Sequence, residues 1–211
     1  MSARDRGVID MLSLSTINRW AKVDMLRPQS VAEHSFRVWV LVQDLYDQMF
    51  DVDSNSFERQ STYEWALIHD AEEVYTGDIP SDVKDLIEHI APGVLDKLKD
   101  HVLRDKMPAV LTKQRGLKGT LPAYLVKIAE ICETILYLRA YGANLAKNQE
   151  VEGFNLDKMN KLLASVSNRY RSLPWQRAYD WVHDILAPQP NPAMPYLETV
   201  PPGTTQVEQS T

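Results

Sequence analysis

The sequence has almost no cysteine and no long apolar run, and these two absences exclude whole classes of protein. Cys132 is the only cysteine among 211 residues, so the chain forms no internal disulfide, as is usual in a reducing compartment. The most apolar window, residues 38–45, contains Gln43 and Asp44 and is far too short to cross a bilayer. The first fifteen residues also lack the apolar core of a signal peptide. We therefore expect a cytoplasmic protein with no membrane partner.

An excess of basic residues is also missing. Lysine and arginine number 23 against 29 aspartates and glutamates, which gives a formal net charge of −6. Binding to a nucleic-acid duplex needs many basic side chains, so such a partner is not expected. A small cationic pocket for one phosphate remains compatible with this composition. A chain of this length commonly forms one domain with a full hydrophobic core.

The alternating pattern and Asn-Gly turns typical of β-sheets are absent as well. Apolar residues instead recur every three or four positions, which predicts an all-α protein of about seven helices. The clearest helix starts after Ser30, where Ser30 and Glu33 form a capping-box pattern. The next is expected at 62–75 and ends before Gly77. Further helices are expected at 82–90, 94–107, 122–141, 155–172 and 175–186, with a loop at 109–121.

The carboxyl-terminal segment has a different composition. Half of the twelve prolines lie between Pro188 and Pro202, and the segment has neither helical periodicity nor enough apolar residues to form a core. We expect one folded domain, 1–187, followed by a disordered proline-rich tail, 188–211. A strand that docks on a neighbouring subunit is the alternative interpretation of the tail.

The histidines divide into two groups by their surroundings. His34 lies on the apolar face of its predicted helix, and His69 is followed directly by Asp70 and, four positions on, by Glu73. On one helix His69, Asp70 and Glu73 would border a common cavity. Imidazoles and carboxylates are the ligands of Zn²⁺, Mn²⁺, Co²⁺ or Fe²⁺, although a His-Asp pair also occurs by chance. The other histidines lack such partners and are expected at the surface: His89, His101 and His183.

Several short motifs resemble one known family. They are INRW at 17–20, EHS at 33–35, HDAEEVYTGDIPSDVK at 69–84 and, more weakly, VKIAE at 126–130. The order of a histidine followed by an HD pair resembles the HD superfamily of phosphohydrolases. The longer stretch is similar to the YfbR-like 5′-deoxynucleotidases and the related phage deoxynucleoside triphosphohydrolases. The resemblance implies that residues 1–187 form a single HD-domain helical bundle.

This resemblance implies a site for a divalent transition metal. Its ligands would be His34, His69 and Asp70. The family's fourth ligand is an aspartate, but this sequence has Glu130 at that position. The longer side chain leaves direct coordination, coordination through water and no coordination all open. Glu133, three residues on, is a less favoured substitute.

The resemblance also implies roles around the metal. Glu73 and Asp78 would be the catalytic residues that act on the phosphate and its attacking water. Arg19 and Trp20 would bind the substrate, because arginine holds phosphate in a bidentate manner and tryptophan packs on a sugar or base. Lys84 would add positive charge near the phosphate.

Two reactions on a deoxynucleotide fit this site, and both place water on the α-phosphorus. A 5′-deoxynucleotidase releases phosphate from a monophosphate, which the small size of the chain slightly favours. The alternative is a triphosphohydrolase with a dATP-like substrate. The loop before residue 122 contains cations that either bind the outer phosphates or face solvent: Lys113, Arg115 and Lys118. A non-catalytic nucleotide-binding module is a second alternative, supported only by Glu130. The resemblance also implies a homo-oligomer, a dimer or higher.

Overall fold

The computed structural model describes residues 3–51 and 56–187, and within these ranges the chain is helical. Its only strand-like pairings there are two isolated bridges, Asn18–Ser30 and Met25–Gly142. The all-α prediction is therefore confirmed. The predicted tail, 188–211, lies outside the described residues, so the domain boundary at 187 stays a prediction. None of the described helices combines the length and apolarity that a membrane span requires.

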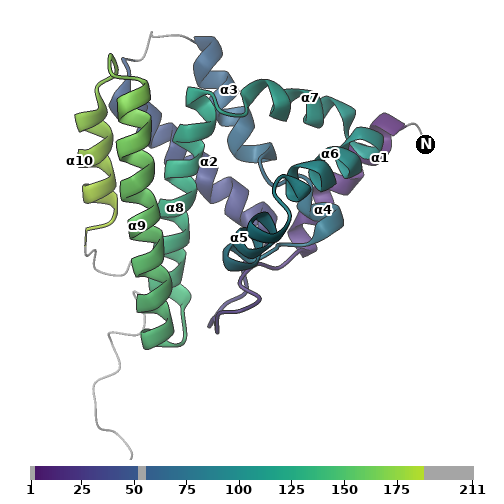
Figure 1. Ribbon diagram of the computed structural model, residues 1–211, viewed down its shortest axis with the longest axis horizontal. Helices are drawn as coiled ribbons and strands as arrows, with labels where there is room; N and C mark the ends of the chain where they lie inside the picture. Colours follow the sequence, from purple (N-terminus) through teal and green to yellow (C-terminus); the bar gives the residue numbers. More distant parts are fainter. Residues whose placement is uncertain (1–2, 52–55, 188–211) are drawn as a thin grey trace, which may run out of the picture.

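The helices form two groups (Figure 1). The larger group contains α2 (Val31–Met49), α3 (Ser56–Ile68), α8 (Leu121–Tyr141), α9 (Leu145–Arg169) and α10 (Trp175–Ile185). The smaller contains α1 (Ala3–Leu12), α4 (Glu73–Thr76), α5 (Ser81–Ile90), α6 (Val94–Lys106) and α7 (Pro108–Leu117). A short 3₁₀ helix, η1 (Ser13–Thr16), follows α1. Contacts between α3 and α7 join the two groups.

The core of the larger group is formed by the apolar faces that the sequence predicted. Val38, Val42 and Leu45 of α2 are fully buried against Leu125 and Ile128 of α8. The side chain of Ser30 accepts a hydrogen bond from the backbone nitrogen of Glu33, 3.1 Å away, and so caps α2 as expected. A second apolar cluster lies in the smaller group and consists of Ala71, Leu103, Met107 and Leu111.

The predicted helix 62–75 is wrong, because α3 ends at Ile68 and residues 69–72 form a turn before α4. The break has a visible cause. The carbonyl of Ile68 accepts a hydrogen bond from the Gln114 side chain at 2.5 Å, and that of His69 accepts one from Lys99 at 2.9 Å. These side chains, from α7 and α6, satisfy the carbonyls that the helix would otherwise bond internally. The predicted stop at Gly77 is confirmed as the end of α4.

Two other predictions of the sequence are corrected. The expected loop 109–121 is largely helical, since α7 starts at Pro108 and buries Leu111; proline is well tolerated in a first helical turn. The helix expected at 155–172 begins ten residues earlier, at Leu145, where the Asn144 side chain accepts a hydrogen bond from the backbone nitrogen of Lys147. With α1, α4 and α7 added, the described part has more helices than the seven expected.

Candidate metal centre and active-site cavity

The three predicted metal ligands come together in the structure. His34 lies in the first turn of α2, while His69 and Asp70 occupy the turn after α3. One potential ligand atom from each residue lies within 4.8 Å of the other two. The Asp70 carboxylate is 3.8 Å from Nε2 of His34 and 3.2 Å from Nε2 of His69. The break in the helix therefore places the His-Asp pair against α2.

Both imidazole rings are held through Nδ1. His69 Nδ1 lies 2.9 Å from the carbonyl oxygen of Ala66, and His34 Nδ1 lies 2.7 Å from a carboxylate oxygen of Glu133. These oxygens accept a hydrogen bond from Nδ1–H, which leaves the lone pair of each ring on Nε2. Both Nε2 atoms are buried, and neither has a hydrogen-bond partner among the described residues. Two buried, unpartnered nitrogens beside a carboxylate fit a divalent metal ion.

The charges around this group favour an ionised aspartate. Burial alone would raise the pKa of Asp70, but His69, His34 and Lys84 hold it well below its usual range. Burial and the positive charge of Arg19 lower the pKa of His34, which favours the neutral imidazole that a metal requires. For His69, burial acts in the same direction, but the adjacent Asp70 raises the pKa overall.

Glu133 has a structural role that the sequence did not reveal. It is fully buried on α8, and besides His34 it accepts hydrogen bonds from Gln29 at 2.7 Å and from Arg37 at 2.8 Å. The guanidinium of Arg19 lies 3.5 Å from Oε2 of Glu133, the oxygen that also contacts His34. The sequence analysis expected Glu133 at most as a substitute ligand, whereas in the structure its carboxylate holds the ring of His34. A charged residue that directly follows the apolar residues Ile131 and Cys132 is a signal of such a buried partner.

Glu130 lies close to this group but does not belong to it. Its carboxylate pairs with Lys127 at 2.5 Å, and the three-residue ligand group does not include it. Burial would raise the pKa of Glu130, but Lys127 and His69 lower it to about 2. This arrangement does not test the expectation that Glu130 is a fourth ligand.

A cavity of about 540 Å³ opens beside Asp70. Its lining includes the remaining residues that the sequence singled out, contributed by the 17–30 loop, α4, α5 and α8: Arg19, Trp20, Glu73, Asp78, Lys84 and Glu130. The opposite wall comes from α9, whose part in the site the sequence did not predict. One cavity therefore contains both the candidate metal centre and the candidate substrate-binding residues.

Glu73 is part of α4 and lines the cavity from there. The sequence analysis expected it on one continuous helix with His69. Glu73 is buried, and one of its oxygens accepts a hydrogen bond from Lys84 at 3.1 Å. The other oxygen has no partner among the described residues. Burial and the charge of Asp70 raise the pKa of Glu73 to about 8, against the opposing effect of Lys84. A buried carboxylate with one free oxygen is suited to exchanging a proton with a bound molecule.

Trp20 is held at the cavity edge in a strained conformation. Its φ angle is +70°, in the left-handed region that residues with a side chain rarely adopt. The indole nitrogen donates to the Gln29 side chain at 2.8 Å, and the ring stacks on Tyr137 with centroids 6.0 Å apart. The neighbouring Arg19 donates its backbone N–H to the Gln29 carbonyl at 2.8 Å. Strain of this kind is typical of binding sites.

The basic residues of segment 109–121, which the sequence analysis expected to be a loop, pair with carboxylates outside the cavity. Lys113 pairs with Glu64 at 2.7 Å, Lys118 pairs with Asp96 at 2.6 Å, and Arg115 pairs with Asp100. None of the three belongs to the described lining of the cavity. The surface positions predicted for the unplaced histidines are confirmed: His89, His101 and His183 are exposed.

Comparisons with known proteins agree with these observations. The sequence model of the family described as "5′-deoxynucleotidase YfbR-like" matches residues 9–165. A dATP triphosphohydrolase of Cyanophage S-2L is 27% identical over 157 residues, which are 73% of this chain and 81% of the phage protein. A 5′-deoxynucleotidase of Photorhabdus temperata is 32% identical over 100 residues, 46% of this chain and 51% of that protein.

A solved structure has the same fold. It is the Cyanophage S-2L HD phosphohydrolase bound to dA and one catalytic Zn²⁺ ion, with a TM-score of 0.60 and 22% sequence identity. The match covers 84% of this chain and 95% of the phage chain. The helical arrangement described above is therefore shared with that phage protein.

Proposed function

Because the chain belongs to the family of YfbR-like 5′-deoxynucleotidases, we propose that it is a metal-dependent phosphohydrolase that cleaves the phosphoester of a deoxynucleotide. One observation carries this proposal. The two buried Nε2 atoms of His34 and His69 have no partner among the described residues and lie beside Asp70, at a cavity that also contains Glu73 and Arg19. A binding module without chemistry would not need to leave these nitrogens free.

His34, His69 and Asp70 would hold the metal, and their ligand types suit Zn²⁺, Mn²⁺, Co²⁺ or Fe²⁺. Such an ion polarises phosphate oxygens and lowers the pKa of water. Glu130 lines the same cavity and pairs with Lys127. We therefore assign it a place outside the coordination sphere, where it sets the charge of the cavity.

The protein's own groups divide the remaining tasks. The guanidinium of Arg19 and the ammonium of Lys84 bind the phosphate, since both line the cavity. Glu73, whose pKa is raised to about 8, is protonated at neutral pH, and we assign it the donation of a proton to the 5′ oxygen. Asp78, on the same lining, is assigned the acceptance of a proton from the attacking water. Trp20 packs on the deoxyribose.

The reaction balances as a hydrolysis. The water oxygen forms a bond to the α-phosphorus, the bond between that phosphorus and the 5′ oxygen breaks, and the 5′ oxygen takes up a proton. The products are a deoxynucleoside and the phosphate that was attached to it. Homo-oligomerisation remains a prediction, and the mass of the protein in solution tests it.

The test is incubation of the purified protein with dNMPs, NMPs and dNTPs in the presence of Mn²⁺ or Co²⁺, followed by identification of the products. We expect deoxynucleosides, formed faster than ribonucleosides and only with metal. Asp70→Ala is the control for a contaminating phosphatase. A metal-loaded protein that binds deoxynucleotides and hydrolyses none of them would contradict the proposal and favour a non-catalytic nucleotide-binding module.

A further inference from the structure

One face of α9 forms a wall of the cavity. The residues that line it follow helical spacing, so they make a single stripe: Lys147, Glu150, Val151, Phe154, Asn155 and Lys158. In Figure 1, α9 runs beside α8 and begins at the end of α8 that lies near the 17–30 loop. The bridge between Met25 and Gly142 joins that loop to the connection between the two helices. The stripe therefore leads away from the loop of Trp20 towards the middle of α8.

The cations along the cavity are almost all paired with carboxylates. The pairs among the described lining residues and their neighbours are Arg19 with Glu133, Lys22 with Asp82, Lys84 with Glu73, and Lys147 with Glu150. Lys158 differs, because it has neither a hydrogen bond nor an ion pair within the described part of the chain. It is half-buried in the cavity wall. An ammonium group in that position is only partly compensated by water.

Other positive charges gather around Lys158. It experiences the charges of Lys127 on α8 and Lys84 on α5, as well as those of the carboxylates Glu130 and Asp85. Burial and the two lysines lower its pKa, whereas the two carboxylates raise it. Lys84 and Lys158, which line the cavity, and Lys127 behind it therefore act on one another electrostatically from three helices. A polyanion bound there would offset their mutual repulsion.

The middle of the stripe is apolar and lies between the Lys147–Glu150 pair and Lys158. Val151 and Phe154 line the cavity about one to two helical turns before Lys158. Seven residues separate Val151 from Lys158, which corresponds to roughly 10 Å along the helix axis. The wall thus changes from apolar to cationic over about the length of a nucleotide's sugar and phosphates.

We propose that Lys158 anchors the outer phosphates of a deoxynucleoside triphosphate, which is the substrate class of this cavity. The inference rests on the proposed function, because the α-phosphorus must lie at the metal ligands. The base and sugar then lie against Trp20 and Phe154, and the β- and γ-phosphates extend to Lys158. Water bonds to the α-phosphorus, its bond to the 5′ oxygen breaks, that oxygen gains a proton, and triphosphate leaves intact. A monophosphate would leave Lys158 without a counter-charge.

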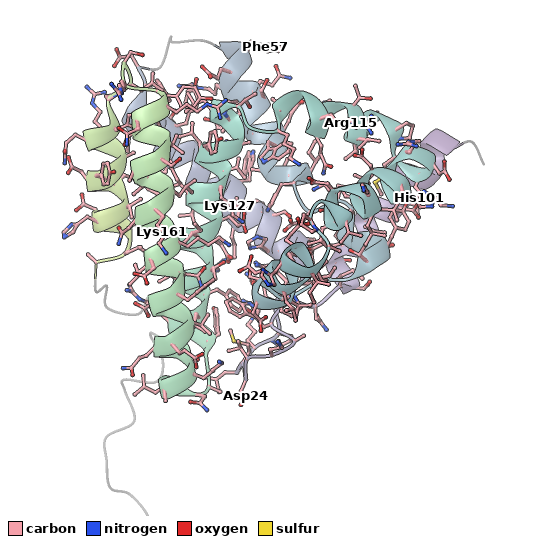
Figure 2. All side chains as sticks on the ribbon, viewed as in Figure 1. Asp24, Phe57, His101, Arg115, Lys127 and Lys161 are labelled. Atoms are coloured by element: carbon pink, nitrogen blue, oxygen red, sulfur yellow. The ribbon has the colours of Figure 1, made fainter. Side chains whose placement is uncertain are left out.

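Two variants on the same helix test the inference. Lys158→Ala removes the ammonium group, and Lys161→Ala, three residues on and exposed, is the matched control (Figure 2). Values of kcat and KM are measured for a dNTP and for the matching dNMP with saturating metal. Because a charged group bonded to phosphate contributes strongly to binding, Lys158→Ala should raise KM for the dNTP about tenfold and leave KM for the dNMP within about twofold. Lys158→Arg should recover most of the loss.

Binding of inorganic tripolyphosphate to the metal-loaded protein supplies a readout without turnover. Lys158→Ala should weaken it about tenfold, and Lys161→Ala should leave it unchanged. Hydrolysis of dNMPs alone by the unsubstituted protein would overturn the triphosphate assignment and leave the proposed function standing. Equal changes in KM for both substrates, or no change, would overturn the role of Lys158. Absence of any deoxynucleotide hydrolysis would instead refute the proposed function itself.

Discussion

Replacing Glu133 by glutamine keeps the shape of the side chain and removes its charge, which isolates its role in orienting His34. One carboxylate oxygen accepts the bond from His34 Nδ1, and the other accepts bonds from Gln29 and Arg37. The amide of glutamine offers one acceptor oxygen and one donor nitrogen. If the nitrogen faces His34, the imidazole proton moves to Nε2 and blocks the metal position. If the amide nitrogen faces Gln29 and Arg37 instead, its N–H groups point at the donor groups of those side chains, and the two hydrogen bonds are lost.

The size of the effect follows from these contacts. Loss of a partner that orients a ligating histidine typically weakens metal binding 10- to 100-fold, which corresponds to about 1.4–2.8 kcal/mol. The metal-free protein should also lose stability. Removing one partner of a fully buried ion pair costs about 3–5 kcal/mol. Since the Arg37 side chain is 33% exposed, we expect a smaller loss of about 2–3 kcal/mol for Glu133→Gln.

Competition for metal against a chromophoric chelator measures the first effect, and denaturant unfolding of the metal-free protein measures the second. Glu64→Gln is the matched control, because Glu64 forms an exposed pair with Lys113. That change should cost less than about 1 kcal/mol and leave metal affinity unaltered. If a folded Glu133→Gln protein binds metal as tightly as the parent, Glu133 does not set the orientation of His34.

Four further outcomes are expected. Asp70→Ala and His69→Ala each remove a ligand, so each should abolish both metal retention and hydrolysis; turnover with metal still bound would contradict the assigned centre. Arg19→Ala should raise KM about tenfold or more and weaken metal binding much less, and unchanged kinetic constants would assign Arg19 to packing. Glu130→Gln should retain metal within about threefold, because the carboxylate pairs with Lys127 and not with the ligand group. Gln114→Leu removes one of the two hydrogen bonds that the Ile68 carbonyl accepts, the other coming from the backbone N–H of Ala71, and should destabilise the fold by about 0.5–1.5 kcal/mol, measured by thermal unfolding.

The parts of the site that could be predicted from the sequence depend on local pattern. His34 occurs on the apolar face of a helix whose start is marked by Ser30, so its inward direction could be deduced before the structure. His69 and Asp70 belong to a motif long enough to indicate a family. These residues do come together, although the roles assigned to them remain proposals.

The features that the sequence analysis missed depend on contacts between residues that are far apart in the sequence. The end of α3 at Ile68 is caused by side chains 31 and 46 positions further along, Lys99 and Gln114, and no local signal marks the break. The early start of α9 was missed because its first turns are polar and contain Gly153, so they show no apolar periodicity. Glu133 was misjudged for the same reason, since Gln29 and Arg37 lie about a hundred positions away.

The hydrogen bonds that end α3 also join the metal ligands to the helices behind them. Lys99 and Gln114 hold the backbone of the His69 turn from α6 and α7, which lie outside the cavity. Opening of these helices would release the turn, so the smaller group of helices and the ligands form one cooperative unit. A ligand that binds only the closed unit stabilises it by mass action, by an amount that grows with the concentration of free metal. The local stability of α6 and α7 is therefore set in part by the supply of metal, and harmful substitutions need not lie near the cavity.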